Sequence, residues 1–157
     1  MSRRATNLVV LVFGIASLIP GKPAEATDYV VGPDTGMLAS IGDVPWESLV
    51  AGDQVLIHWR ATSYKEKWVI CRKGTAESPI VVSGVPGPSG QLPVIDGSDA
   101  VTRTALSFWN ESRGVIKIGG ASIPTDTLPA HIVIENLDIR SARPTYTFTN
   151  DSGGTET

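Results

Sequence analysis

Three residues near the carboxyl end combine types and spacing that could do chemistry. Glu135, Asp138 and Arg140 fall within six positions of one another, in a stretch where apolar and polar residues alternate. Alternation puts them on the side of a strand that faces away from the apolar residues. Paired carboxylates can act as general acid and base, and an arginine can bind an anionic group. We therefore take these three as candidate substrate-binding residues. An ordinary solvated charged face is the alternative.

Other reactive residue types give weaker signals. His58 and His131 lie in strand-like stretches with no Cys or His at ligand spacing, so no metal site is predicted. Cys71 is the only cysteine, which excludes an internal disulfide. Its place in an alternating stretch favours a small strand residue over a nucleophile. The chain has no nucleophile elbow, phosphate loop or dinucleotide motif, so no cofactor is predicted and no catalytic residue can be assigned.

The amino end has the order of a secretory signal peptide. Arg3 and Arg4 precede an apolar run over residues 8–19, which is followed by Pro20 and then by an Ala-Glu-Ala triplet at 24–26. The run is too short to be a stable membrane anchor, since about 20 residues are needed. We expect cleavage after Ala26 and a secreted or periplasmic protein.

Composition indicates one folded domain after that segment. Apolar residues make up 41% of the chain and charged residues 18%, which excludes a disordered chain. The net charge of −3 gives no reason to expect a nucleic acid as partner.

Short β-branched runs, separated by Gly, Pro, Asp and Ser, fill the chain from residue 29 onward. They predict a sandwich, a barrel or a solenoid of short strands. The predicted strands are residues 54–59, 68–71, 80–83, 94–95, 105–109, 115–118 and 132–139. A single Asp-Gly pair, at 96–97, could close a two-residue hairpin, and polar residues follow it, which favours a solenoid.

A short helix is predicted before the first of these strands. Asp43 could cap it, Pro45 suits its first turn, and Trp46 and Leu49 share one face. Such a helix would cover the open end of an apolar stack, with Trp46 beneath it. An ordinary surface helix is the alternative, and Trp59 and Trp68 fit the core and the surface equally well.

Asn136 interrupts the clearest alternating stretch. Ile132 and Ile134 alternate before it, and Leu137 and Ile139 resume the alternation after it. Because Asn tolerates the left-handed backbone of a one-residue bend, we expect two short parallel strands that meet at a corner.

Taken in order, these pieces resemble the amino-terminal region of the right-handed parallel β-helix superfamily, which includes pectate-lyase-like and chondroitinase-like proteins. The resemblance rests on Trp-Glu-Ser-Leu at 46–49 with Ala-Gly-Asp at 51–53 and the strand after it, on residues 74–97, and on residues 132–139. It implies an all-β, right-handed, single-stranded parallel β-helix over residues 27–143, with a short cap helix and an irregular or disordered tail at 144–157.

The resemblance also implies polysaccharide processing by a lyase or a hydrolase. Lyases of this kind use a Lys or Arg base and often Ca²⁺, which a longer parent protein could bind. Members of the superfamily usually run to several hundred residues, so we expect a truncated chain without a complete active site. A non-catalytic surface or glycan-binding module is the alternative, and a fragment with no activity of its own is a third reading. An uncovered last coil predicts self-association through the carboxy-terminal end.

Overall fold

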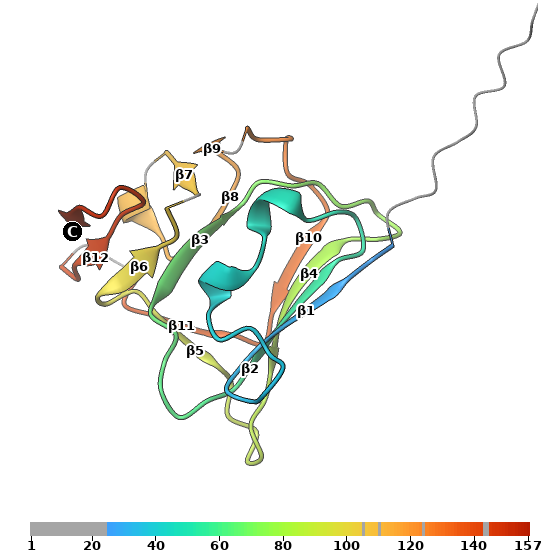
Figure 1. Cartoon of the computed structure of the whole chain (residues 1–157), viewed down its shortest axis with the longest axis horizontal. Helices are drawn as coiled ribbons and strands as arrows, with labels where there is room; N and C mark the ends of the chain where they lie inside the picture. The colour runs from blue at the N-terminus through green and yellow to red at the C-terminus, as the bar shows by residue number, and fades with distance from the viewer. Residues whose placement is uncertain (1–24, 105, 110, 124, 143–144) are drawn as a thin grey trace, which may run out of the picture.

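The computed structural model describes residues 25–157 except 105, 110, 124 and 143–144. The chain is mostly β and its ladders are mainly parallel (Figure 1). The strands are β1 Asp28–Val31, β2 Gln54–His58, β3 Glu66–Ile70, β4 Ile80–Val85, β5 Val94–Asp96, β6 Ala100–Thr102, β7 Ser107–Phe108, β8 Ile116–Ile118, β9 Ala121–Ile123, β10 Ile132–Glu135, β11 Asp138–Arg140, β12 Phe148–Thr149 and β13 Thr155–Glu156. Three short 3-10 helices complete the described part: η1 Ile41–Asp43, η2 Trp46–Ser48 and η3 Glu111–Arg113.

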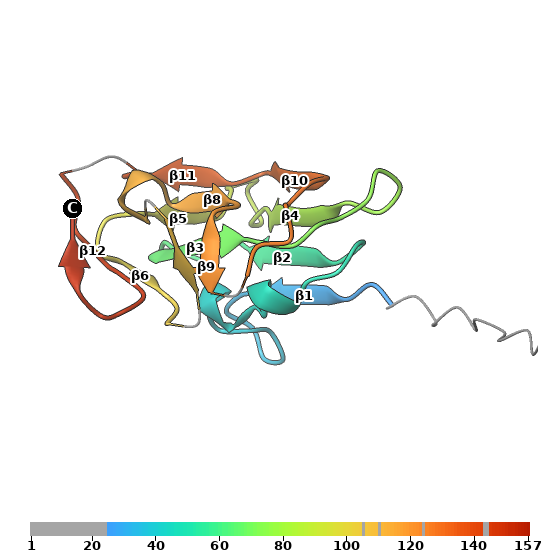
Figure 2. The ribbon, with the colours of Figure 1, turned by 90° about the horizontal axis from the view of Figure 1, so that it is seen from above.

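The first ladder stacks four strands in chain order, β1-β2-β4-β10, all parallel. Its register aligns Tyr29 with Val55, Val55 with Val82 and Val82 with Ile134. Since side chains at aligned positions point to the same face, these residues form one apolar column, in which Val55 and Val82 are fully buried. Figure 2 shows the four strands one above another.

Three further sheets lie beside the first ladder (Figure 1). β11 pairs in parallel with β5, and Tyr64 forms an isolated parallel bridge with Ile95 of β5. β3 has a parallel neighbour on each edge, β6 on one and β8 on the other, and β6 continues to β12 and β13. The strands of the first ladder therefore follow one another in the order of the sequence, whereas the strands next to β3 do not. Antiparallel pairing is confined to β7–β9 and β12–β13 among the described strands.

The predicted bend at Asn136 is confirmed. Asn136 lies between β10 and β11 with a φ of 56°, in the left-handed region. Both strands pair in parallel with the strands below them, β4 and β5. Gly84 lies beneath this corner, where an added Cβ would overlap the carbonyl oxygen of Asn136. The corner thus needs a residue that accepts positive φ at position 136 and a glycine at position 84.

The segment before β2 caps the stack, but not as the predicted helix. It forms two 3-10 turns, and Ser40, not Asp43, is the N-cap of η1. Asp43 is the third residue of a capping box, and Pro45 precedes η2 as its N-cap instead of lying in its first turn. Trp46 is fully buried, as predicted, and its ring stacks on that of Trp68 at 5.4 Å.

The remaining aromatic and thiol residues divide between core and surface. Trp68 is buried, Trp59 is half-buried and Trp109 is 71% exposed. Cys71, directly after β3, is a buried free thiol whose pKa is raised by burial, as expected of a structural residue. Phe148 of β12 is also buried, so part of the segment expected to be an irregular tail packs against β6.

The apolar run at residues 8–19 lies outside the described residues, and so does most of the predicted signal peptide. Within the described part, no helix has the length and apolar character to cross a membrane.

Candidate functional site

The three residues predicted to bind substrate lie at the end of the stack. Glu135 ends β10, and Asp138 and Arg140 begin and end β11. The structure brings Asp138 and Arg140 together in an ion pair of 2.5 Å, and the bond from Arg140 lowers the pKa of the Asp138 carboxyl. Glu135 accepts a hydrogen bond of 3.2 Å from Ser83 Oγ instead. Glu135 and Arg140 are exposed and Asp138 is half-buried, and none of the three lines the hollow between η1, β3 and β6 or the cavity beside Lys67.

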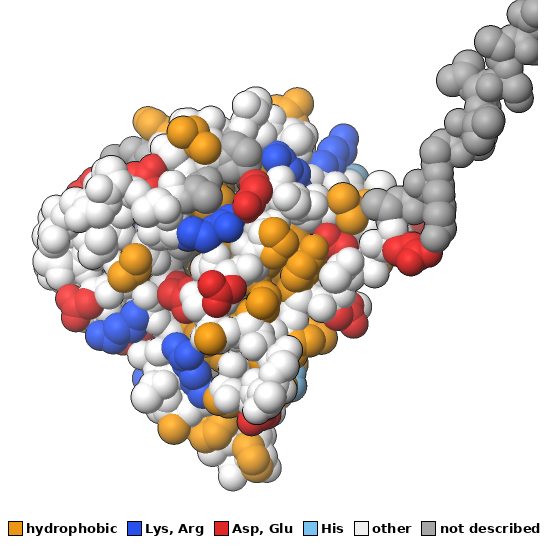
Figure 3. Space-filling view, viewed as in Figure 1, with side chains coloured by type: hydrophobic (Ala, Val, Ile, Leu, Met, Phe, Trp, Pro, Cys, Tyr) orange, Lys and Arg blue, Asp and Glu red, His pale blue; other side chains and the backbone are white. Residues whose placement is uncertain are grey.

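A hollow of about 340 Å³ lies between η1 and the strands β3 and β6. That volume is at the small end of the range of ligand sites, roughly 300–1,000 Å³. Figure 3 shows acidic and basic side chains close together on the face that carries these elements. The residues that line the hollow are Ser40, Gly42, Asp43, Lys65, Glu66, Val101 and Arg103.

Ser40 joins the two carboxylates of this hollow. Glu66, the first residue of β3, accepts hydrogen bonds from Ser40 Oγ at 2.6 Å and from Gly42 N at 2.5 Å. The Ser40 amide donates to Asp43 Oδ2 at 3.1 Å. The capping box of η1 therefore fixes both carboxylates against rigid elements at one wall of the hollow.

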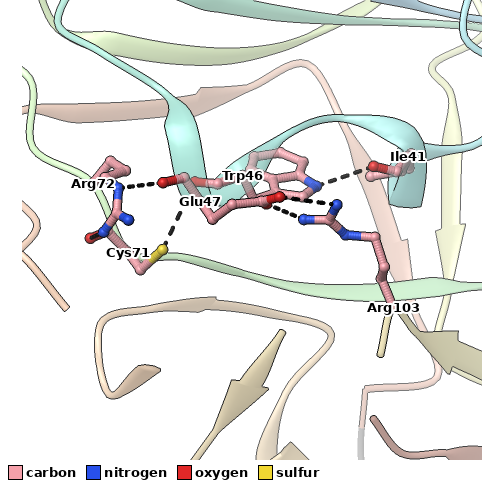
Figure 4. Close-up of polar contacts among 6 residues, drawn as sticks. All are labelled: Ile41, Trp46, Glu47, Cys71, Arg72 and Arg103. Atoms are coloured by element: carbon pink, nitrogen blue, oxygen red, sulfur yellow. Dashed lines mark hydrogen bonds and ion pairs between the residues drawn. The ribbon is translucent and has the colours of Figure 1, made fainter. Parts of the chain in front are cut away.

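Arg103, at the hollow, points toward Glu47 of the segment before β2 (Figure 4). Its guanidinium makes an ion pair with Glu47 of η2, while the Glu47 carbonyl accepts from Arg72 Nε at 2.6 Å. Burial raises the pKa of Glu47, but the hydrogen bonds that its carboxylate accepts and the charges of Arg103 and Arg72 together outweigh burial, so the net pKa is lowered. Arg103 Nε is buried without a hydrogen-bond partner. The positive charge of Arg103 is thus largely neutralised.

Lys65 and Val101 form the more accessible part of the lining. The Lys65 ammonium is 3.5 Å from Asp99 Oδ2 in an exposed ion pair, which contributes little stability and exchanges readily. Val101 of β6 is 51% exposed although it is a strand residue, and it is in register with Glu66. A cation and an apolar surface therefore remain available to a ligand.

A second cluster, around Lys67, is closed. Lys67 is 5% exposed, its Nζ donates to the Glu111 carbonyl at 2.6 Å, and it lies 3.3 Å from the centre of the Phe148 ring. Burial lowers the pKa of Lys67 to about 8 and raises that of Glu111. The cavity beside Lys67 holds about 10 Å³, room for one water molecule at most. Perturbed pKa values can mark an active site, but this cluster admits no substrate.

One wall of the hollow could have been found from a local signal. Ser40-Ile41-Gly42-Asp43 has the Ser-x-x-acidic pattern of a capping box, which fixes a carboxylate at a helix start. Nothing local points to Glu66, Val101 and Arg103, because only the pairing of β3 with β6 brings them there.

No group of three His, Cys, Asp or Glu residues that could hold a metal ion occurs in the described part of the chain. Comparison with protein-family models, curated proteins and solved structures finds no match for this chain.

Proposed function

We propose that this chain is an exported parallel β-helix protein that binds a polysaccharide through the hollow between η1, β3 and β6. The observation that carries the proposal is the hollow itself. It presents hydroxyl, carboxylate and ammonium groups beside one exposed apolar side chain. A sugar ring needs that mixture, because its hydroxyls require donors and acceptors while its C–H faces require apolar contact.

The β-helix part of the proposal rests on the first ladder and the corner at Asn136. Four strands repeat in parallel at one register, with about 26 residues between Asp28 and its aligned partner Gln54. Parallel connections within one sheet are right-handed in nearly all proteins, which favours a right-handed winding. The position of β6 on the opposite edge of β3 from β8 departs from a regular coil, and Val101 of β6 lines the hollow.

Binding is favoured over catalysis by the way the polar groups are occupied. Glu66 Oε2 already accepts two hydrogen bonds, and Arg103 is paired with Glu47. A general acid or base must be able to exchange a proton with substrate, which these contacts oppose. Asp43 and Glu66 nevertheless lie on the same wall of the hollow, and a pair of carboxylates can hydrolyse a glycosidic bond. The assay should therefore also measure hydrolysis.

The test is affinity for a panel of purified polysaccharides, including pectin, alginate and chondroitin, measured by calorimetry. Lys65→Gln should weaken binding at least about tenfold, since a hydrogen bond to a charged group contributes about 1.5–3 kcal/mol. Lys73→Gln is the matched control, because Lys73 is also exposed but lies outside the hollow. No binding to any glycan, or equal losses in the two variants, would overturn the proposal. Release of unsaturated or reducing ends would identify an enzyme instead.

A further inference from the structure

The edge of β11 that faces away from β5 is open. Within the described residues β11 pairs with β5 alone, through Asp138 N to Pro93 O and Gly97 N to Arg140 O, both 3.0 Å. Backbone groups of successive strand residues point to alternate edges. The amide and carbonyl of Ile139, which lies between Asp138 and Arg140, therefore point to the open edge.

The side chain of Ile139 is part of an apolar layer that is covered on one side only. Ile139 is in register with Ile95, which is fully buried, yet Ile139 is 46% exposed. Ile132, Ile134 and Leu137 of the same layer are packed against the core but only partly buried. Figure 2 shows β10 and β11 together along one edge of the body, opposite β1.

We propose that this layer is a dimer interface, in which β11 of one copy pairs antiparallel with β11 of a second copy about Ile139. A twofold axis through this residue lets the two Ile139 residues exchange both of their free backbone hydrogen bonds. It also places Asp138 of each copy opposite Arg140 of the other. Along β11 the residues are an acid, an apolar residue and a base, so antiparallel pairing of two copies brings opposite charges together. Parallel pairing would place like charges opposite each other.

The other end of the stack argues against a second copy adding head to tail. The outer edge of β1 is occupied at its carboxyl-terminal end, since Leu38 N donates to Val30 O at 2.8 Å and Gly32 N donates to Leu38 O at 2.9 Å. A copy that approached this end of β1 through β11 would meet the segment around Leu38 instead of free backbone groups. The open edge is therefore matched by a copy of itself, which gives a closed dimer and not a fibre.

The interface is independent of the proposed glycan site and can be tested without a ligand. Light scattering and sedimentation of the full chain at about 100 µM should give the mass of a dimer, in the range of moderate self-affinities. Asp138→Arg and Arg140→Asp each put like charges opposite one another, so each should raise the dissociation constant at least tenfold. An equimolar mixture of the two variants should restore a dimer. Both side chains are on open surface, so circular dichroism should stay unchanged.

Cross-linking provides a second measurement. Paired residues at the proposed axis have Cα atoms about 5.5 Å apart, within the range of a disulfide. Ile139→Cys should therefore form a covalent dimer on oxidation. Val133→Cys, on the outer face of β10 and similarly exposed at 38%, should not. A monomeric wild type, a mixture that stays monomeric, a mass that grows beyond that of a dimer as the concentration rises, or equal cross-linking of the two cysteines would each refute the proposed dimer.

Discussion

Replacing Lys67 with Met should remove a contribution to stability that grows with pH in alkaline solution. The Lys67 ammonium is 5% exposed, and burial lowers its pKa from 10.5 to about 8. Below pH 8 the amine is protonated in both the folded and the unfolded chain. Between pH 8 and 10.5 the unfolded chain binds more protons, so the free energy of unfolding increases with pH.

The magnitude follows from the difference in pKa. Each tenfold change in proton affinity corresponds to about 1.4 kcal/mol, so the full increase from Lys67 is about 3 kcal/mol. Cys71 and Tyr64 act in the opposite direction, because burial raises their pKa values and their contributions fall as the pH rises. Both are present in the wild type and in Lys67→Met, so the difference between the two proteins isolates Lys67.

The assay is urea unfolding followed by tryptophan fluorescence at several pH values from 7 to 10. The free energy of unfolding of the wild type, minus that of Lys67→Met, should rise by roughly 2–3 kcal/mol over this range. Lys73→Met, at an exposed position, should show no such trend. A constant difference between wild type and Lys67→Met would refute the inference that Lys67 is buried as a cation.

Four further changes test the cluster, the corner and the cap. Glu111→Gln should gain stability relative to the wild type as the pH rises from 4 to 7 in unfolding titrations. The raised pKa of Glu111 means that the wild type loses free energy of unfolding as this carboxyl ionises, and the variant has no such group. Asn136→Ala should lower the melting temperature by an amount equal to about 1 kcal/mol, whereas Asn136→Gly should change it little, since the φ of 56° suits glycine. Gly84→Ala should cost about 1–3 kcal/mol in urea unfolding, because its Cβ would overlap the Asn136 carbonyl; an unchanged midpoint would contradict the parallel register. Trp46→Ala should cost about 3–5 kcal/mol by the same measurement and expose Trp68 to quenchers, since the two rings stack within the core.

Local patterns predicted most of the first ladder and its corner. The strands at residues 54–59 and 80–83 appear as β2 and β4, and the stretch 132–139 divides at Asn136 as expected. These predictions succeed because alternation and a positive-φ residue are decided within a few positions of the chain. β1, β6, β9, β12 and β13 were missed, because such short strands exist only through the neighbours with which they pair.

The cap shows the same limit at one element. The sequence predicted an apolar helical segment with Trp46 beneath it, and Trp46 is buried. Asp43 was predicted as the N-cap in place of Ser40, although the capping-box pattern at residues 40–43 is local. What no local pattern indicates is Glu66, which is 26 positions from Ser40 and accepts hydrogen bonds from both Ser40 and Gly42.

By itself, then, the sequence determined the β-rich character, the bend at Asn136 and the burial of Trp46, all of which follow from the type and order of neighbouring residues. Only the tertiary structure decided that β6 and β8 lie on opposite edges of β3, that Glu66 and Arg103 meet at one hollow, and that Lys67 is enclosed beneath Phe148. Those contacts join residues dozens of positions apart, and their pairing is selected by the packing of the whole chain and not by any local preference.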